Sequence, residues 1–434
     1  MDELRELLAQ TPLSRIVGQQ EIVLLEHNQS VADALKLLAR HHILSAPLVV
    51  NPGLEDVEGM APGESASPQL LGWLDVKDII RAFLAYLHEH KAKLPSNMLA
   101  LMTELEQQGP HFAAKTLITV LGSEDRGLVY QTDAEASVLT AIRDMFLGRQ
   151  PGGRVVHRLA IFDDHGEITH IVSHVDVLRF LLKHKVHLGA AAGQTLRELG
   201  LVAPERGARV VVLEPHTPAL LAYERLAAAG VTGAPVLSTD GELIANLSVS
   251  DIRCPRAASP RPGPRRPPAD AAAVAVVAAA AAAAGRRRGI QPDHLGVLAL
   301  PVAEFLAVKH GTSYLGYSQH GSSAAHPFFA SRRHAAAGGM RAPGADAADA
   351  DGARAAAAGG GGGDDVPLIT CAADATLLEV LTTMCDNVVH RVYVREPGAK
   401  PHEVVGVVTP TDILTLLASL GEWGGGEAGE KMEG

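Results

Sequence analysis

The spacing of apolar residues predicts four amphipathic helices, one in each of four similar segments. In each segment, apolar residues recur at intervals of three and four, which places them on one face of a helix. The four helices are expected to start at Val31, Val138, Ala219 and Leu377. Each is followed by an apolar strand, a turn and a second apolar strand. We therefore expect four units with the order strand–helix–strand–strand–helix.

The four units share one register, which identifies them as copies of one fold. The interval from the first helix to the following strand is the same in units 1, 3 and 4, and residues 148–153 add a surface loop in unit 2. A unit of about 60 residues is too small to bury a good core alone. We therefore expect α/β units (α+β modules) that pack in pairs. The predicted domains are residues 13–90, 115–187, 194–254 and 366–421.

Two stretches interrupt the repeat. Residues 255–289 combine Pro-Arg repeats with an alanine block, and residues 311–365 are rich in Ala, Gly and Asp. Both lack periodic large apolar residues, which predicts disordered low-complexity insertions. Residues 290–310, between them, carry a short apolar element that we assign to the start of unit 4.

Composition narrows the classes of partner. The 434 residues carry a formal charge of -11 and only 4% aromatic residues, which argues against binding to nucleic acid. Arg286–Arg288 could serve nuclear import or RNA contact, but low-complexity sequence is the interpretation we favour. The longest uncharged apolar run, residues 271–284, is short for a membrane span, and the N-terminus has no signal pattern. We expect a cytoplasmic protein, with the nucleus as the alternative.

No catalytic constellation emerges from the motifs. The chain has neither a P-loop nor a Gly-x-Ser-x-Gly elbow, and Cys254, Cys371 and Cys385 are scattered. We therefore expect neither an enzyme nor a metal site, and no cofactor.

A polar tetrad lies where the second strand of each unit meets the second helix. Ser or Thr followed three residues later by an acidic residue is typical of a capping box. A helix N-terminus also suits phosphate, and a carboxylate there suits the two hydroxyls of a ribose. Capping and ligand binding are compatible, so both interpretations remain open. The tetrads are Asp75–Asp78, Ser173–Asp176, Ser248–Asp251 and Thr409–Asp412.

The fourfold pattern with its Ser/Thr-x-x-Asp tetrads resembles the CBS domain. Four copies in one chain resemble the gamma subunit of AMP-activated (SNF-type) protein kinase. The phrases at 156–159 and 389–392, each with a His-Arg pair, look like that family's phosphate contacts. Residues 246–253 and 300–306 are most similar to the plant-type gamma-like branch. The resemblance implies two Bateman modules, each a pair of CBS domains, that form a disc.

The resemblance also implies regulation without catalysis. The chain would sense AMP, ADP or ATP between units and regulate the catalytic and scaffold subunits of a SNF-type kinase. Adenine nucleotide is then a regulatory ligand. The implied nucleotide-binding residues are Asp78, Ser173, Asp176, Ser248, Asp251, Thr409, Asp412, His157, Arg158, His390 and Arg391. Solvated strand ends are the alternative for the two arginines, and a ligand-independent interaction scaffold is the alternative for the whole protein.

Units 1 and 3 depart from the family pattern. Leu44-Ser45 and Thr232-Gly233 occupy the places of the two His-Arg pairs, so the positive charge comes from units 2 and 4. This weakens the expected phosphate cluster, above all for a triphosphate. Asp75 replaces the usual Ser or Thr and adds a negative charge. The site beside it is expected to be empty or to prefer an uncharged adenosine moiety.

Overall fold

The computed structural model describes most of the repeat. Described are residues 2–18, 20–41, 43–50, 69–90, 95–121, 131–132, 134–148, 156–163, 167–202, 210–239, 241, 243–252, 295–309, 368–396 and 404–420. The predicted insertions at 255–289 and 311–365 lie outside the described residues, as does most of the loop predicted at 148–153. In the part of the chain that is described, no helix is both long and apolar enough to span a bilayer.

All four predicted units are present. Unit 1 comprises β1 (Leu25–Glu26), α2 (Val31–Arg40), β2 (Ser45–Val50), β3 (Gln69–Asp75) and α3 (Val76–Glu89). Unit 2 comprises β4 (Gln131–Thr132), α6 (Val138–Thr140), η2 (Ala141–Phe146), β5 (Arg158–Phe162), β6 (Ile168–Ser173) and α7 (His174–Lys183). Unit 3 comprises α9 (Ala219–Ala228), β7 (Gly233–Leu237), β8 (Leu243–Ser248) and η5 (Val249–Ile252). Unit 4 comprises β9 (Thr370–Ala372), α14 (Leu377–Asp386), β10 (Val392–Arg395), β11 (Val404–Val408) and α15 (Pro410–Leu420).

Connecting elements precede or join the units. They are α1 (Asp2–Gln10), η1 (Leu13–Arg15), α4 (Met98–Ala113), α5 (Leu117–Val120), η4 (Lys185–Gly193), η6 (Leu295–Ala299) and α11 (Val302–Lys309). In units 1, 2 and 4 the first strand pairs in parallel with the second, which pairs antiparallel with the third. Unit 3 has the antiparallel pair, and a single parallel bridge from Leu213 to Val236 stands in place of its first strand.

Local sequence explains where the first helices begin. Ser30, Ser137 and Thr376 cap α2, α6 and α14 by accepting a backbone N–H three residues later. The helix of unit 2 differs from the regular one predicted, because it continues from Ala141 to Phe146 as a π-helix. Its last turn is closed by a hydrogen bond from Leu147 N–H to Ile142 C=O. A π-turn accommodates one extra residue, which apolar spacing alone does not reveal.

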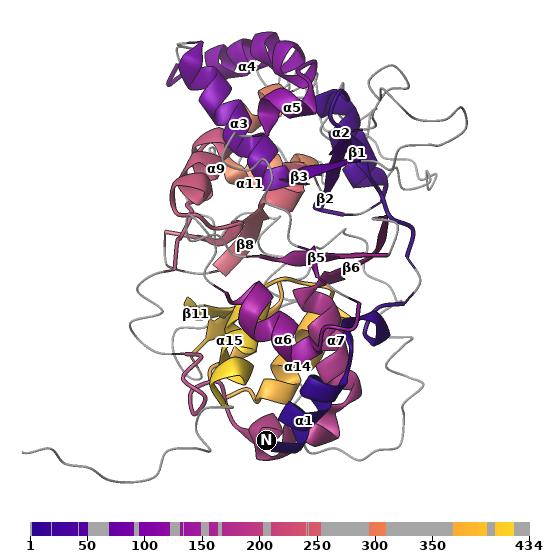
Figure 1. The fold of residues 1–434 in the computed structure, drawn as a ribbon. Coiled ribbons are helices and arrows are strands. Elements are labelled where there is room, and N and C mark those ends of the chain that lie inside the picture. The colour runs from indigo at the N-terminus through magenta and orange to yellow at the C-terminus, as the bar shows by residue number, and fades with distance from the viewer. Residues whose placement is uncertain are drawn as a thin grey trace, which may run out of the picture.

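Two hydrophobic cores join units that are not consecutive in the chain. The first core contains Leu35 and Phe83 of unit 1 together with Tyr223 and Ile244 of unit 3. In Figure 1, α3, α9 and α11 gather in the upper half of the molecule. The second core joins units 2 and 4, with α6, α7, α14 and α15 in the lower half. Amphipathic helix faces thus bury each other between unit 1 and unit 3, and between unit 2 and unit 4.

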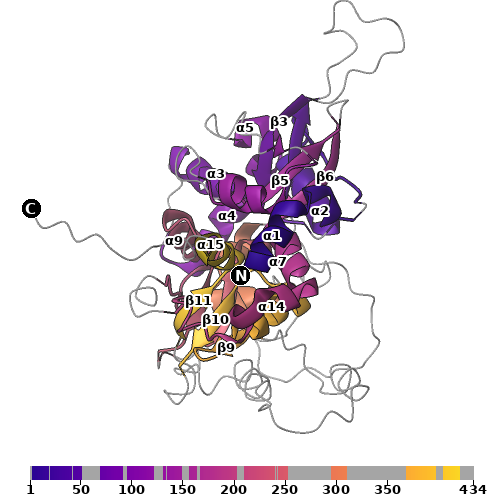
Figure 2. The ribbon, with the colours of Figure 1, turned by 60° about the horizontal axis from the view of Figure 1, so that its bottom comes forward.

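The second core also takes in the N-terminal helix. Leu4 and Leu8 of α1 are buried there, and α1 contacts unit 2. Helix α1 contacts α6 and η4, and Figure 2, turned from Figure 1, brings α1 and the N-terminus to the front of the molecule. Residues 2–10 therefore belong to the fold although they precede the first predicted unit.

The segment before each unit packs beside another unit. The backbone at Thr116, which precedes unit 2, forms a bridge to Ser30 of unit 1, and Pro12, which precedes unit 1, bridges to Ser137 of unit 2. The same exchange links units 3 and 4. Their bridges are Thr195–Thr376 and Pro218–Pro301. The segment that leads into one unit thus packs against the other unit of the same pair, in units 1 and 2 and again in units 3 and 4.

The exchange determines where residues 295–309 lie. The sequence assigns this stretch to the start of unit 4, but Leu298, Val302 and Phe305 are buried in the core of units 1 and 3. Lys309, at the end of α11, donates hydrogen bonds to the C=O groups of Ser250 and Asp251 in unit 3. The apolar pattern of the segment shows that it is buried, but not against which unit.

Val388 adopts a left-handed backbone conformation after α14. Its φ is 50°, and the hydrogen bond from Val389 N–H to Met384 C=O closes the helix end. Gly230, with φ 68°, has the same role after α9 in unit 3. A left-handed φ costs a residue with a β-carbon about 1–2 kcal/mol, and glycine avoids that cost.

Replacing Val388 by glycine should therefore stabilise the protein. The strain relieved exceeds the extra chain entropy of glycine, about 0.5–1 kcal/mol, so the expected net gain is about 0.5–1 kcal/mol. Urea unfolding measures it, with Val388→Ala as the matched control because alanine keeps the β-carbon. An alanine variant as stable as the glycine variant would show that backbone strain is not the cause.

Candidate functional site

The acidic residue of every tetrad caps its own helix or turn. In each tetrad, Oδ2 of the Asp accepts the backbone N–H of the first residue. The N···O distances are 3.0 Å for Asp78, 2.9 Å for Asp176, 2.7 Å for Asp251 and 2.9 Å for Asp412. The capping interpretation is thus confirmed for all four tetrads.

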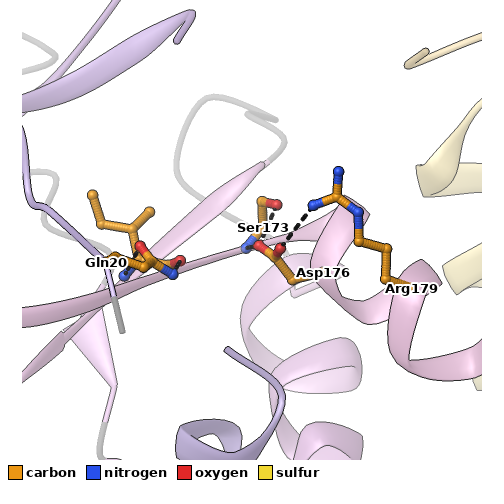
Figure 3. Close-up of polar contacts among 5 residues, drawn as sticks. Gln20, Ser173, Asp176 and Arg179 are labelled. Carbon is orange, nitrogen blue, oxygen red and sulfur yellow. Dashed lines mark hydrogen bonds and ion pairs between the residues drawn. The ribbon is translucent and has the colours of Figure 1, made fainter. Parts of the chain in front are cut away.

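The second carboxylate oxygen of Asp176 faces an exposed arginine. Its Oδ1 lies 3.5 Å from Nη1 of Arg179, whose side chain is 52% exposed (Figure 3). Unit 1 repeats this contact, with 3.8 Å between Asp78 Oδ1 and Arg81 Nη1. Burial, assisted by the neighbouring charge of Asp75, raises the pKa of Asp78. A ribose diol can therefore reach these carboxylates only by displacing a surface arginine.

A glutamine from the start of the chain covers the strand before the unit 2 tetrad. Gln20 donates from Nε2 to the C=O of Ile171 over 2.9 Å, and its Oε1 accepts the N–H of the same residue over 3.3 Å (Figure 3). The Gln20 side chain thereby satisfies the N–H and the C=O of Ile171. These two groups lie on the open edge of β6, which has no further strand beside it among the described residues.

Arg158 joins unit 2 to unit 1, at a place we call the 1–2 junction (Ser45, Asp75 and Arg158). Its Nη1 donates to Ser45 Oγ over 2.7 Å and lies 3.8 Å from Asp75 Oδ2. The Arg158 and Asp75 side chains are only 21% and 18% exposed. Burial lowers the pKa of Arg158, while the charges of Asp75 and Asp176 raise it. This guanidinium therefore has a hydrogen-bond acceptor and a counter-charge from its own chain.

Arg391 joins unit 4 to unit 3 in the related place, which we call the 3–4 junction (Thr232, Gly233, Asn246, Ser248, Arg391 and Tyr393). Arg391 Nη2 donates to Thr232 Oγ1 over 2.7 Å. Its Nη1 is buried and has no hydrogen-bond partner among the described residues. A β-carbon built on Gly233 would lie 1.4 Å from that Nη1. The glycine therefore makes the space that the guanidinium occupies.

Tyrosine and carboxylate groups complete the 3–4 junction. Tyr393 donates its hydroxyl hydrogen bond to Asn246 Oδ1. Burial raises the pKa of Tyr393 to about 12 and Asp251 raises it too, while the charge of Arg391 and a side-chain hydrogen bond with Arg391 lower it. The charges of Asp251 in unit 3 and Arg391 in unit 4 thus both act on Tyr393, so a tetrad carboxylate and a guanidinium lie within electrostatic range of the same hydroxyl group.

Two neighbouring histidines, the buried His174 and the partly buried His157, lie near basic groups of three units. The rings of His157 and His174 are 5.2 Å apart between centroids. Burial, together with the charges of Lys77, Arg158 and His390, lowers the pKa of His157 to about 4. Burial likewise lowers the pKa of His174 to about 3. Basic side chains of units 1, 2 and 4 therefore lie within electrostatic range of His157.

The structure brings together most of the residues that the sequence singled out. Both His-Arg pairs lie at contacts between units, and Asp176 and Asp251 lie close to the arginine or tyrosine of a junction. Asp78 lies beside Asp75. Ser173, Ser248 and Thr409 are the first residues of their tetrads and donate their N–H groups to the capping carboxylates. Thr409 and Asp412 form hydrogen bonds with each other through the Thr409 N–H and hydroxyl groups.

Sequence reasoning missed Lys77, His174, Asn246 and Tyr393 as site residues. His174 stands in its tetrad where the other units have Val76, Val249 and Pro410. A histidine in an otherwise apolar place was the available signal. Asn246 and Tyr393 carry no local signal, because each acquires its role only from the other unit.

An apolar cavity of about 20 Å³ lies elsewhere, between units 1 and 3. Its lining includes Leu35, Phe83, Tyr223 and Leu298. It offers no polar group suited to a nucleotide and belongs to the first core.

Comparison with known proteins identifies the repeated unit. Residues 364–419 match the CBS domain family model. The whole chain resembles a protein from Methanocaldococcus jannaschii described as a proposed archaeal homologue of γ-AMPK, with a TM-score of 0.52 and 13% identity over 94% of this chain and 100% of that one. This likeness shows the fold.

Weaker likenesses extend to two further structures. A conserved protein from Pyrococcus horikoshii has a TM-score of 0.39 and 13% identity over 94% of this chain and 100% of that one. CBSX2, solved in complex with AMP, has a TM-score of 0.25 and 14% identity over 40% of this chain and 98% of that one. The sequence matches no curated protein.

Proposed function

We propose that this chain, which has four units of one fold and matches the CBS domain family in the last of them, is a non-catalytic regulatory protein that binds an adenine nucleotide at the 3–4 junction. The observation that carries the proposal is Arg391. Its Nη1 is buried and lacks a hydrogen-bond partner among the described residues, while its Nη2 is held by Thr232. Cytoplasm or nucleus would be the compartment.

An unsatisfied buried guanidinium nitrogen favours an anionic ligand. Leaving a buried donor without a partner costs about 1–3 kcal/mol, and more for a charged group. A phosphate oxygen about 4 Å away would gain roughly 4 kcal/mol at an effective dielectric of 20 before desolvation. Planar guanidinium also suits the geometry of phosphate. Phosphate is therefore the chemistry that best completes this residue.

The nearby carboxylate fits the sugar of the same ligand. Asp251 and Arg391 both influence the pKa of Tyr393 through their charges, so all three belong to one electrostatic environment. Its Oδ2 accepts the Ser248 N–H, which fixes the orientation of the carboxyl group. A nucleotide combines a ribose diol, which suits the carboxylate of Asp251, with a phosphate, which suits the guanidinium of Arg391.

Regulation of a SNF-type kinase is the finer part of the proposal. Units 3 and 4 belong to different cores, which they share with unit 1 and unit 2 respectively. A ligand between units 3 and 4 therefore contacts both cores at once. If the two cores can adopt two arrangements, a nucleotide that binds one arrangement more tightly shifts the equilibrium toward it. A catalytic or scaffold subunit that contacts both cores would respond to this shift, and its size is the coupling free energy.

Calorimetric titration with AMP, ATP and adenosine tests nucleotide binding. Arg391→Ala should weaken AMP binding by about tenfold or more, because a hydrogen bond to a charged group contributes about 1.5–3 kcal/mol. Adenosine binding should change little. Arg225→Ala removes the same charge from an exposed place on unit 3 and is the control. Equal losses for AMP and adenosine would mean that Arg391 does not contact phosphate, and no heat at millimolar nucleotide would refute binding.

One observation favours a second candidate, a ligand-independent interaction scaffold. All four tetrad carboxylates already serve as caps, and Arg158 is already satisfied by Ser45 and Asp75. Capture of a kinase partner that is unaffected by nucleotide and by Arg391→Ala would support this candidate.

A further inference from the structure

We propose that Asp75 is a built-in counter-anion that closes the 1–2 junction to phosphate, so that nucleotide phosphate binds only at the 3–4 junction. The proposal rests on the proposed function and states which junction performs it. It predicts that the chain binds one nucleotide, although its two His-Arg pairs could form two phosphate sites.

The two junctions are structurally equivalent, which makes their difference informative. In unit 1, Ser45 pairs with Asp75 across β2 and β3. In unit 3, Gly233 pairs with Ser248 across β7 and β8. Asp75 and Ser248 thus hold the same place in the sheet, at the end of the strand before the tetrad.

The arginines facing these two places have different surroundings. Arg158 Nη1 has Ser45 Oγ at 2.7 Å and Asp75 Oδ2 at 3.8 Å. Arg391 Nη1 has no hydrogen-bond partner among the described residues, and the neighbouring unit has a neutral serine at position 248. A phosphate at the 1–2 junction would meet the largely buried carboxylate of Asp75, whereas the equivalent place at the 3–4 junction has the neutral Ser248.

Capping does not account for the choice of aspartate at position 75. Its Oδ1 accepts the Lys77 N–H over 2.9 Å, which is the capping contact, while Oδ2 is the oxygen that faces Arg158. In unit 2 the equivalent helix, α7, begins after Ser173, whose side chain forms a capping box with Asp176. A serine at position 75 would therefore be sufficient for capping. The second oxygen of Asp75 and its negative charge must have another role.

Other charges around Arg158 do not replace Asp75. Asp176, in the same unit, also favours the charged guanidinium, but its Oδ2 accepts the Ser173 N–H and its Oδ1 faces Arg179. Positive groups nearby include Lys77, whereas His157 is neutral at pH 7 because burial and neighbouring charges lower its pKa to about 4. Removal of the Asp75 charge would leave the junction with a net positive, partly buried guanidinium like that of Arg391.

Two reciprocal substitutions test the proposal on the full chain. Asp75→Ser gives unit 1 the residue of units 2 and 3 and keeps a capping oxygen, and Asp75→Asn removes the charge at nearly constant shape. Ser248→Asp places a carboxylate beside Arg391. The probe is AMP, and both calorimetry and native mass spectrometry measure the number bound per chain. Thermal unfolding checks that each variant folds.

We expect the wild type to bind one AMP, and Asp75→Ser and Asp75→Asn to bind two. Adding Arg158→Ala to Asp75→Ser should restore the number to one, and Ser248→Asp should weaken AMP binding at the 3–4 junction by tenfold or more.

If the wild type binds one AMP and both Asp75 variants also bind one, the role of Asp75 is overturned and the proposed function stands. Two AMP in the wild type would overturn it as well. If the wild type binds none and Asp75→Ser binds one, the role of Asp75 stands and the 3–4 site fails; no binding in any variant rejects both.

Discussion

Acidification from pH 7 to pH 5 should lower the free energy of unfolding by about 4 kcal/mol through His157 and His174 alone. Burial lowers the pKa of His157 to about 4 and that of His174 to about 3, from an ordinary value of 6.5. The His174 ring lies edge-on against Phe146, with 4.6 Å between ring centroids. Its Nε2 has no hydrogen-bond partner among the described residues. A proton on either ring is therefore poorly solvated.

The direction follows from which state binds more protons. Between pH 6.5 and about 4, unfolded histidines are protonated while the folded ones remain neutral. The unfolded state gains stability as pH falls through that window, so the folded state loses it. At pH 5 each histidine contributes about 2 kcal/mol of that loss, because pH 5 lies about 1.5 units below the unfolded pKa.

Urea unfolding at pH 7 and pH 5 measures the effect, with His174→Gln as the matched variant. Glutamine keeps a polar side chain but does not titrate, so its loss between the two pH values should be smaller by about 2 kcal/mol. Val186→Ala, at an 82% exposed position without a titratable group, is the control and should lose as much stability between the two pH values as the wild type. An unchanged pH dependence in His174→Gln would show that this ring is protonated in the folded protein.

Phe305→Ala should cost about 3–5 kcal/mol of stability, the range for removal of a large buried ring. The Phe305 side chain is 1% exposed, and its ring packs edge-on against Tyr223 with 6.0 Å between centroids. Both belong to the core of units 1 and 3. The cost combines lost burial with the cavity left between α11 and α9.

The measurement is urea unfolding of Phe305→Ala beside Val186→Ala. Val186 is 82% exposed, so its truncation should change stability by less than about 0.5 kcal/mol. A loss below about 1 kcal/mol in Phe305→Ala would mean that residues 295–309 do not pack against unit 3.

Local sequence determined the units and their helix starts. The apolar face beginning at Val31 and the Ser30 cap specify α2 without any distant contact, and the Thr376 capping box does the same for α14. The tetrads and the two His-Arg pairs were also evident from the sequence. These features depend on residues only a few positions apart, where periodicity and capping operate.

Tertiary structure alone decided which units share a core and what each arginine meets. Arg158 and Ser45 are separated by 113 residues, and Arg391 and Thr232 by 159. An amphipathic face specifies that it must be buried but not against which partner, because any apolar face of suitable shape satisfies it. The exchange of segments between units, and with it the contrast between Asp75 beside Arg158 and Ser248 beside Arg391, therefore follows from the folded arrangement.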